Sequence, residues 1–407
     1  MERLLINNPD YFKPETIESI RKEFKFSQSI HIEMLLWDFE IFAQLTAIHK
    51  DFVLKGGAAT QIYLPVEKQR ASRDIDLATT LTEKEVETEL NAVKKRFEER
   101  VSNNEHFTWS SAKPPREPKK KIEELHCYEL IIPTKIGSSF GKQNASILKI
   151  DAICYDKLPF KVINLEAPTL FNLNLKPFPI ISKGSLIGDK LLTLADSTVG
   201  ILAKNEDDYE SYFKQIYDLT YLIDFFIANE EVLNDIFFTI EHLTPIELKY
   251  RKMDKSIKEV LIDIIESLEK KKYFDCGSSE LSQNLRDSIT NFRANYLNKE
   301  EWLIPDYWAA RISKIQFFTK LLLNLIENQI KADDIISIFE KLKKIEIQLA
   351  DLSGDDIKKM QQALMSYYKG DAKIGKPLKN KPVKTVFYRV LDAKNWIDLS
   401  KLFWDEI

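Results

Sequence analysis

Apolar residues recur at steps of three and four along much of the chain, which is the spacing of an amphipathic helix. Over Ser27–Ala47 this pattern predicts a helix with one apolar side toward a core, formed by Ile32, Leu35, Leu36, Phe39, Phe42 and Leu45. A second helix is predicted over about 83–102, because Thr82 and Glu85 have the spacing of a capping box ahead of a helical apolar pattern. Beyond about residue 185 the same period predicts helices over 209–228, 245–272 and 306–328.

Runs of β-forming residues between these helices predict strands. Phe52–Leu54 is a short run that stops at Gly56 and Gly57, and a helix is expected to open directly after that turn. Further strands are predicted over 74–79, 125–133, 145–155 and 161–165. Turn residues between the second and third of these predict an antiparallel pair.

The order of these elements predicts an α+β protein. A mixed sheet with flanking helices would occupy residues 1–184, and a mainly helical domain would follow over 185–407. A chain of 407 residues has room for two or three domains, each able to bury its own core.

Composition narrows the class of protein. Hydrophobic residues make up 44% and charged residues 30%, which is typical of a soluble globular protein. With a net charge of −4, any nucleic-acid contact must come from a local basic surface. The basic runs at 113–121 and 369–384 are candidates for RNA-backbone contact, although a solvated loop is the simpler interpretation of each.

Cysteines and apolar runs exclude other classes. Cys127, Cys154 and Cys276 lie far apart and lack the paired spacing of a zinc site or a disulfide framework. The chain shows no signal-peptide pattern and no uninterrupted apolar stretch of about 18 residues. We therefore predict a cytoplasmic protein that does not contact the membrane.

The strongest chemical pattern is a strand, a double glycine, a helix and then an acidic strand. Gly56 and Gly57 would let the backbone approach a phosphate, with the amides of the new helix pointing at the anion. Asp74 and Asp76 are two residues apart, so on a strand both side chains leave the same face. Such carboxylates repel each other unless a hard cation such as Mg²⁺ lies between them. Each part is common by chance, and the ordered set carries the functional interpretation.

Five stretches together resemble the AbiEii-type toxins, a branch of the polymerase-β-like nucleotidyltransferases tied to abortive infection and type IV toxin–antitoxin pairs. The resemblance covers roughly residues 30–225 and rests on LKGGAATQIYL, RASRDIDL, KIDAI, GDKLLTLAD and IYDLTYL. It implies that Asp74 and Asp76 bind Mg²⁺ or Mn²⁺, and that the double glycine lies under the nucleotide phosphates. The implied nucleotide-binding residues are Lys55, Gly56, Gly57, Ala58, Ser72 and Lys190.

The resemblance also implies three further catalytic residues. Asp151, on a neighbouring strand, would help to activate the attacking hydroxyl, unless it is a solvent-facing residue of an edge strand. Lys190 and Asp218 match a later lysine and aspartate of the family's site, and the plain alternatives are an exposed helical lysine and a surface aspartate paired with a lysine. The chain departs from the family at Ala58, where a Ser or Thr is usual. The missing hydroxyl removes one donor to phosphate, and whether Ser72 compensates is left open by the sequence.

The resulting hypothesis is transfer of an NMP from an NTP to an acceptor hydroxyl. The resemblance implies RNA or tRNA as acceptor, a role as the toxin of a bacterial toxin–antitoxin or phage-defence system, and a cognate antitoxin as partner. One alternative is a catalytically silent module on the same fold that binds a nucleotide or a protein, with Ala58 as its best support. Another is a helical scaffold in which residues 230–407 do the work.

Overall fold

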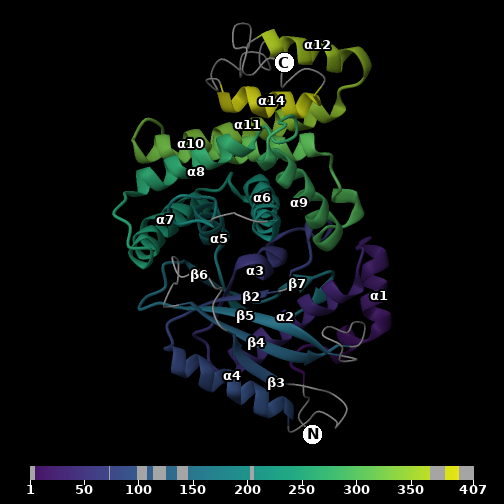
Figure 1. Ribbon diagram of the computed structural model, residues 1–407, viewed down its shortest axis with the longest axis vertical. Coiled ribbons are helices and arrows are strands. Elements are labelled where there is room, and N and C mark those ends of the chain that lie inside the picture. Colours follow the sequence, from purple (N-terminus) through teal and green to yellow (C-terminus); the bar gives the residue numbers. More distant parts are fainter. Residues whose placement is uncertain are drawn as a thin grey trace. The chain divides into compact units, whose positions relative to one another are not determined.

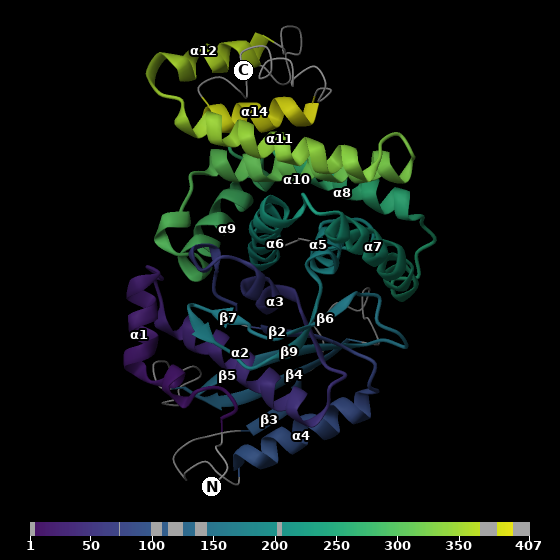
Figure 2. The ribbon, with the colours of Figure 1, turned by 180° about the vertical axis from the view of Figure 1, so that it is seen from behind.

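The computed structural model describes residues 5–72, 74–98, 108–112, 125–134, 145–201, 206–366 and 381–393 (Figures 1 and 2). The basic run at 113–121 and most of that at 369–384 lie outside the described residues. The chain divides into two compact units. The first contains Met1–Asp189, Asp235–Asp254 and Arg293–Trp302, and the second contains Lys190–Asn234, Lys255–Phe292 and Leu303–Ile407. A domain boundary at residue 184 stays a prediction.

A mixed sheet forms the centre of the first unit. Among the described residues it has seven strands in the order β3-β4-β5-β2-β1-β9-β6. Their bounds are β1 Val53–Lys55, β2 Asp74–Thr79, β3 Thr108–Ala112, β4 Leu125–Pro133, β5 Ala145–Cys154, β6 Val162–Leu165 and β9 Phe178–Ile181. The pairs β2–β5 and β1–β9 are parallel, and the other neighbouring strands are antiparallel. The predicted strands at 74–79, 125–133, 145–155 and 161–165 are confirmed, including the antiparallel pairing of β4 with β5.

Helices of the first unit pack around this sheet (Figure 2). Their bounds are η1 Pro9–Phe12, α1 Pro14–Glu23, α2 Ser29–Ile48, α3 Gly56–Tyr63, η2 Val66–Lys68 and α4 Glu83–Glu98, and a small hairpin joins β7 Thr169–Leu170 to β8 Leu173–Asn174. Helix α5 Lys183–Leu192 contains the boundary of the two units, which falls between Asp189 and Lys190. The capping box of α4 is formed as predicted: the Thr82 N–H donates to the Glu85 carboxylate at 2.8 Å, and the Glu85 N–H donates to Thr82 Oγ1 at 3.4 Å. The predicted continuation of this helix to residue 102 lies outside the described residues.

Helix α2 is confirmed, but the expectation of one apolar and one polar side is wrong. The helix contacts α1, α4 and the strands β2, β5 and β9, so it is buried nearly all round. Glu40 is buried with its carboxylate satisfied. It accepts hydrogen bonds from the backbone N–H groups of Ile6 (2.8 Å) and Asn7 (2.9 Å) and from the side chains of Asn7 (3.0 Å) and Gln44 (2.6 Å). Glu40 thus fastens the N-terminal segment to α2.

Asp38 on the same helix is buried without such support. Its side chain is 1% exposed, and neither carboxylate oxygen has a hydrogen-bond partner among the described residues. Burial, together with the negative charges of Asp74 and Asp76, raises the pKa of Asp38 well above its ordinary value. An unpaired buried carboxylate of this kind destabilises the folded state.

Helices continue through the rest of the chain. Their bounds are α6 Glu206–Phe226, α7 Glu230–Tyr250, α8 Ile257–Lys271, α9 Glu280–Tyr296, η3 Lys299–Glu301, α10 Pro305–Ile326, α11 Ala332–Asp351, α12 Gly354–Ser366 and α14 Val383–Ala393. The predicted helices at 209–228 and 306–328 are confirmed as α6 and α10. No helix among the described residues is long and apolar enough to cross a membrane.

The prediction of one helical segment over 245–272 is wrong. Helix α7 ends at Tyr250 and α8 begins at Ile257. Lys252 has a φ of 54° between them, which no α-helix accommodates. A capping box then starts α8: the Ser256 Oγ accepts from the Glu259 N–H at 3.2 Å, and the Glu259 carboxylate accepts from the Ser256 N–H at 2.8 Å. This Ser-x-x-Glu signal was present in the sequence.

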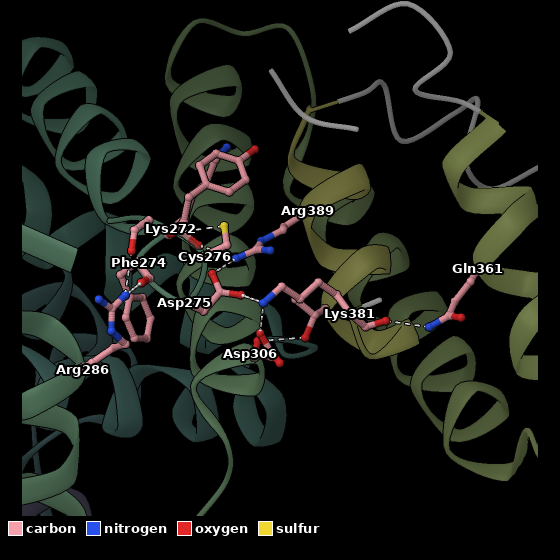
Figure 3. Close-up of polar contacts among 12 residues, drawn as sticks. Lys272, Phe274, Asp275, Cys276, Arg286, Asp306, Gln361, Lys381 and Arg389 are labelled. Carbon is pink, nitrogen blue, oxygen red and sulfur yellow. Dashed lines mark hydrogen bonds and ion pairs between the residues drawn. The ribbon is translucent and has the colours of Figure 1, made fainter. Parts of the chain in front are cut away.

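The second unit has an aromatic core and a buried ionic network. The Trp308 ring of α10 meets the rings of Phe213 and Phe292 edge-on, each with centroids 5.7 Å apart. Helix α14 packs on α10 and α12, and its Arg389 forms an ion pair with Asp275 in which both side chains are fully buried (Figure 3). Lys381 also contacts Asp275 (3.0 Å) and reaches Asp306 at 2.6 Å. Charged groups therefore fasten α14 to its neighbours.

We expect Asp38→Asn to stabilise the protein at neutral and alkaline pH. The folded-state pKa of Asp38 is raised, so the folded protein loses stability as pH rises above the unfolded-state pKa of about 4. An amide cannot ionise, so the gain should be about 1–3 kcal/mol at pH 8 and shrink toward pH 4. Urea denaturation at both pH values measures this. As a contrast, Glu40→Gln places an amide against four hydrogen-bond donors and should destabilise the protein. An Asp38→Asn protein that is less stable than wild type at pH 8 would contradict the interpretation.

Replacing Arg389, the buried arginine of α14, should destabilise the second unit strongly. Arg389→Met leaves Asp275 buried with one cationic partner fewer, and breaking a buried pair costs about 3–5 kcal/mol. The double variant Asp275→Asn/Arg389→Met should recover part of this loss. Lys358→Ala, which breaks an exposed pair with Asp355, is the control and should leave the urea midpoint unchanged. An equally small effect of Arg389→Met would show that the buried network does not fasten α14.

Candidate active site

The double glycine lies directly against the acidic strand. Helix α3 begins at Gly56 itself, one residue after β1 ends, so the expectation that the helix opens after both glycines is wrong. Gly56 has a φ of +67°, and a Cβ there would lie 1.8 Å from Oδ2 of Asp76. Only glycine allows this approach. The Gly57 N–H donates to the same oxygen of Asp76 at 3.3 Å, so the glycine turn holds a carboxylate of the site.

Four side chains form a row across four adjacent strands. In the strand register, Lys55 of β1 is opposite Asp76 of β2, Asp76 is beside Asp151 of β5, and Asp151 is opposite Cys127 of β4. Paired positions in a sheet place their side chains on the same face. The row therefore brings Asp76 and Asp151 together, and Asp74 lies on the same face two residues along β2. Ile75 and Leu77, between and after them, are buried on the opposite face.

Asp151 is not on an edge strand. Its strand β5 lies between β2 and β4, so the plain alternative of a solvent-facing edge residue is wrong. Burial raises the pKa of Asp151, and a hydrogen bond from the Cys127 thiol and the charge of Lys149 oppose that rise, while Asp74 adds to it. The carboxyl thus lies inside the row, with the Cys127 side chain next to it on the neighbouring strand.

The crowding of carboxylates is strongest at Asp76. Burial raises the pKa of Asp76 to about 7, and the neighbouring charges of Asp151 and Asp74 contribute to the rise. Lys55 and the Gly57 N–H act in the opposite direction. A carboxyl with a pKa near neutrality is poised to exchange its proton for a cation.

Lys55 is the cation of this row. Its Nζ lies 3.0 Å from Oδ1 of Asp189 on α5 and 5.3 Å from the centre of the Phe160 ring. Burial alone would lower the pKa of Lys55, but Asp189, Tyr155 and Asp76 outweigh it and raise that pKa above its ordinary value. Lys55 therefore stays charged, and its predicted contact with the nucleotide stays a prediction.

Ala58 and Ser72 lie on either side of the glycine turn. Ala58 is fully buried in the first turn of α3. A Cβ at Gly57 would come within 2.9 Å of the Ser72 Oγ and 3.3 Å of an Arg70 guanidinium nitrogen, so both side chains border Gly57. Ser72 thus brings a hydroxyl close to the start of α3, where Ala58 has none.

Lys190 and Asp218 contact each other in the second unit. The Lys190 Nζ lies 2.7 Å from Oδ2 of Asp218 and donates to Oε1 of Gln215 at 3.1 Å. Both charged groups are buried, so the exposed lysine and the surface placement of the aspartate are wrong, whereas the pairing of Asp218 with a lysine is confirmed. Their roles toward a nucleotide stay predictions.

The carboxylates suit a metal site completed by a substrate. Within the described parts of the chain, no group of three or more His, Cys, Asp or Glu side chains is placed to hold a metal ion. Mg²⁺, however, is commonly held by one or two carboxylates together with water and substrate phosphates. Asp74 and Asp76, on one face of β2 with the pKa of Asp76 raised by burial and by its acidic neighbours, fit that kind of donor set.

Sequence reasoning missed three residues near this row. Cys127 and Asp189 become neighbours of Asp151 and Lys55 only through strand register and helix packing. Asp38 lies in the segment that forms helix α2, which also contains the acids Glu33 and Glu40, so its acidic side chain alone did not distinguish it in the sequence.

Comparison with known proteins identifies the family of this chain. A protein from H. pylori assigned as a nucleotidyltransferase has a similar structure, with 14% identity, a TM-score of 0.39, and coverage of 73% of this chain and 96% of that one. The nucleotidyltransferase toxin MenT4 from Mycobacterium tuberculosis H37Rv has 10% identity, a TM-score of 0.35, and coverage of 76% and 98%. No curated protein matches the chain. The family model for the nucleotidyl transferase AbiEii toxin of type IV toxin–antitoxin systems matches residues 41–318. Because that match spans more than half of its 407 residues, the chain belongs to the AbiEii nucleotidyltransferase toxin family.

Proposed function

We propose that the chain transfers an NMP from an NTP to an acceptor hydroxyl with the help of a divalent cation, Mg²⁺ or Mn²⁺. The observation that carries the proposal is the row in which Asp76 and Asp151 lie side by side while the double glycine packs on Asp76. Two carboxylates on adjacent strands and a third on the same face suit a reaction that needs a bound cation to neutralise phosphate charge and a base to activate a hydroxyl.

Each residue of the row has a distinct task in this proposal. Asp74 and Asp76 hold the cation, which supplies positive charge to the triphosphate. Asp151 accepts the proton of the attacking hydroxyl. Lys55 stays charged beside Asp76 and limits the repulsion within the row. Gly56 and Gly57 allow the triphosphate to approach the start of α3, with the Ser72 hydroxyl beside them.

Lys190 is proposed to neutralise triphosphate charge, as the resemblance of GDKLLTLAD to the family implies. In the structure it is paired with Asp218, which keeps the ammonium desolvated and oriented. A lysine of this kind can exchange part of its contact with the carboxylate for a phosphate oxygen. Asp218 then serves to orient Lys190.

We further propose that the acceptor is RNA, with a tRNA end as the specific case, and that the protein acts in the cytoplasm as a toxin countered by a cognate antitoxin. Support comes from membership of a family of type IV toxins. The resemblance of the site motifs to that family supports an RNA hydroxyl as acceptor.

A catalytically silent nucleotide-binding module is the second candidate. It is favoured by Ala58, which offers no hydroxyl at the helix start, and by the Gly57 N–H, which already donates to Asp76. Against it, a site released from chemistry has no physical reason to keep Asp74, Asp76 and Asp151 crowded on one face.

We expect Asp76→Asn and Asp74→Asn each to lower nucleotidyl transfer by at least about a hundredfold, since losing even a supporting partner of a metal ligand costs about 10–100-fold. The measurement is incorporation from each α-³²P-labelled NTP into total bacterial RNA with Mg²⁺. Asp51→Asn, an exposed aspartate ahead of β1, is the control and should keep wild-type activity.

Transfer at the wild-type rate by Asp76→Asn would overturn the assignment of the site. Wild-type protein that binds NTP in the presence of Mg²⁺ but never labels an acceptor or releases pyrophosphate would favour the silent module. Label in DNA or protein, with none in RNA, would reject the proposed acceptor and leave the reaction standing.

Cation binding should strengthen as pH rises through neutrality. The pKa of Asp76 is about 7, so a proton and the cation compete for the same carboxyl. Apparent Mn²⁺ affinity should be about tenfold weaker at pH 6 than at pH 8, because the ionised fraction of Asp76 falls by about that factor. Electron paramagnetic resonance titration of Mn²⁺ with a non-reactive NTP analogue measures this without turnover. An affinity that is flat across this range, or unchanged in Asp76→Asn, would contradict a role of Asp76 as ligand.

A further inference from the structure

Cys127 occupies the end of the row of site residues. It lies on β4 directly opposite Asp151 of β5, and the same register places Asp151 beside Asp76. Cys127 is half-buried, so its thiol borders the site and is still within reach of small reagents. Nothing in the sequence motifs of the site includes this residue.

The antiparallel register places the Cys127 side chain directly against the Asp151 side chain, where the thiol can donate a hydrogen bond to the carboxyl. A thiol has one proton, so it can engage one carboxylate oxygen and leave the other available. Within the described residues, we find no other hydrogen bond to the Asp151 side chain. By contrast, Asp76 is held on the other side of the row by the Gly57 N–H.

The environment keeps this thiol in its donor form. Burial raises the pKa of the Cys127 thiol to about 12, and the negative charge of Asp151 and the hydrogen bond between the two groups add to the rise. At neutral pH the sulfur therefore keeps its proton, which a thiolate nucleophile would not. A permanent donor beside a carboxylate fits a positioning role and not a covalent one.

We propose that Cys127 is a positioning residue that orients Asp151 for proton acceptance from the attacking hydroxyl. The thiol fixes one Asp151 oxygen and turns the other toward the acceptor. This inference rests on the proposed function of Asp151, and it adds a residue that acts through Asp151 without contacting the nucleotide.

The first test compares Cys127→Ala with Cys127→Ser in the full-length protein. Alanine removes the donor, and serine keeps a hydroxyl donor at the same position. We expect Cys127→Ala to lower kcat about tenfold with the KM for NTP within about twofold, the size of effect found for partners that orient site ligands. Cys127→Ser should restore kcat to within about threefold of wild type.

The matched control is Cys154→Ala. Cys154 is also a half-buried thiol of the same sheet, but it is paired in register with Thr79 and lies outside the row. This variant should keep wild-type kcat and KM. Equal kcat for Cys127→Ala and wild type would overturn the proposal, as would a serine variant as slow as the alanine variant.

A second measurement tests the contact without any turnover. In Asp151→Asn the negative charge that raises the thiol pKa is gone, so iodoacetamide should alkylate Cys127 severalfold faster at pH 8, while Cys154 reacts at its wild-type rate. Unchanged alkylation of Cys127 would show that the thiol and Asp151 are not coupled. Faster alkylation of Cys127 in Asp151→Asn, found together with a wild-type protein that transfers no nucleotide, would instead reject the proposed function and leave the thiol–carboxyl contact established.

Discussion

The contact between Asp76 and the glycine turn positions the residues of the candidate site in the first unit. Because Gly56 has no side chain, the Asp76 carboxylate lies where a Cβ would otherwise be, and the Gly57 N–H donates to it. One strand–turn–helix connection thereby fixes a carboxylate of β2, the start of α3 and the position of Lys55 at the end of β1. The parallel pairing of β2 with β5 then decides which residue stands next to that carboxylate, and it is Asp151.

Buried charge recurs throughout the protein, with different energetic consequences. Glu40 and Arg389 are buried with partners for their charge, and each fastens a terminal segment to its unit. Asp38 has no hydrogen-bond partner in the part of the chain that the structure describes, and Asp76 has acidic neighbours. Groups of the first kind destabilise the fold when one partner is removed, whereas groups of the second kind weaken it unless a ligand or a proton compensates. The candidate active site is therefore a locally destabilised part of the first unit.

The sequence was sufficient for elements with strong local signals. The strand at Asp74–Thr79 and the helix capped by Thr82 follow from alternation and from a capping box, which depend only on near neighbours. The all-round burial of α2 did not follow, because it depends on α1, α4 and the sheet closing around a helix whose apolar positions look one-sided. For the site, the double glycine and the two acids of β2 were readable as an ordered set. The neighbours Cys127 and Asp189 were not, since they meet the row only through cross-strand register and through the packing of α5.

The effect of Ala58, at a position where the family usually has Ser or Thr, depends on the side chains around the glycine turn. Ala58 is fully buried, so a hydroxyl there would need an internal partner or a ligand to compensate for its burial. Ser72 and Arg70 already border Gly57 from the segment that leads into β2, and they bring polar atoms to the same place from another direction. The loss of one hydroxyl thus leaves the turn polar. The crowded carboxylates are harder to explain without a cation, because repulsion among Asp74, Asp76 and Asp151 is a cost that a cation bound between them would relieve. That cost favours an active nucleotidyltransferase over a silent relative of one.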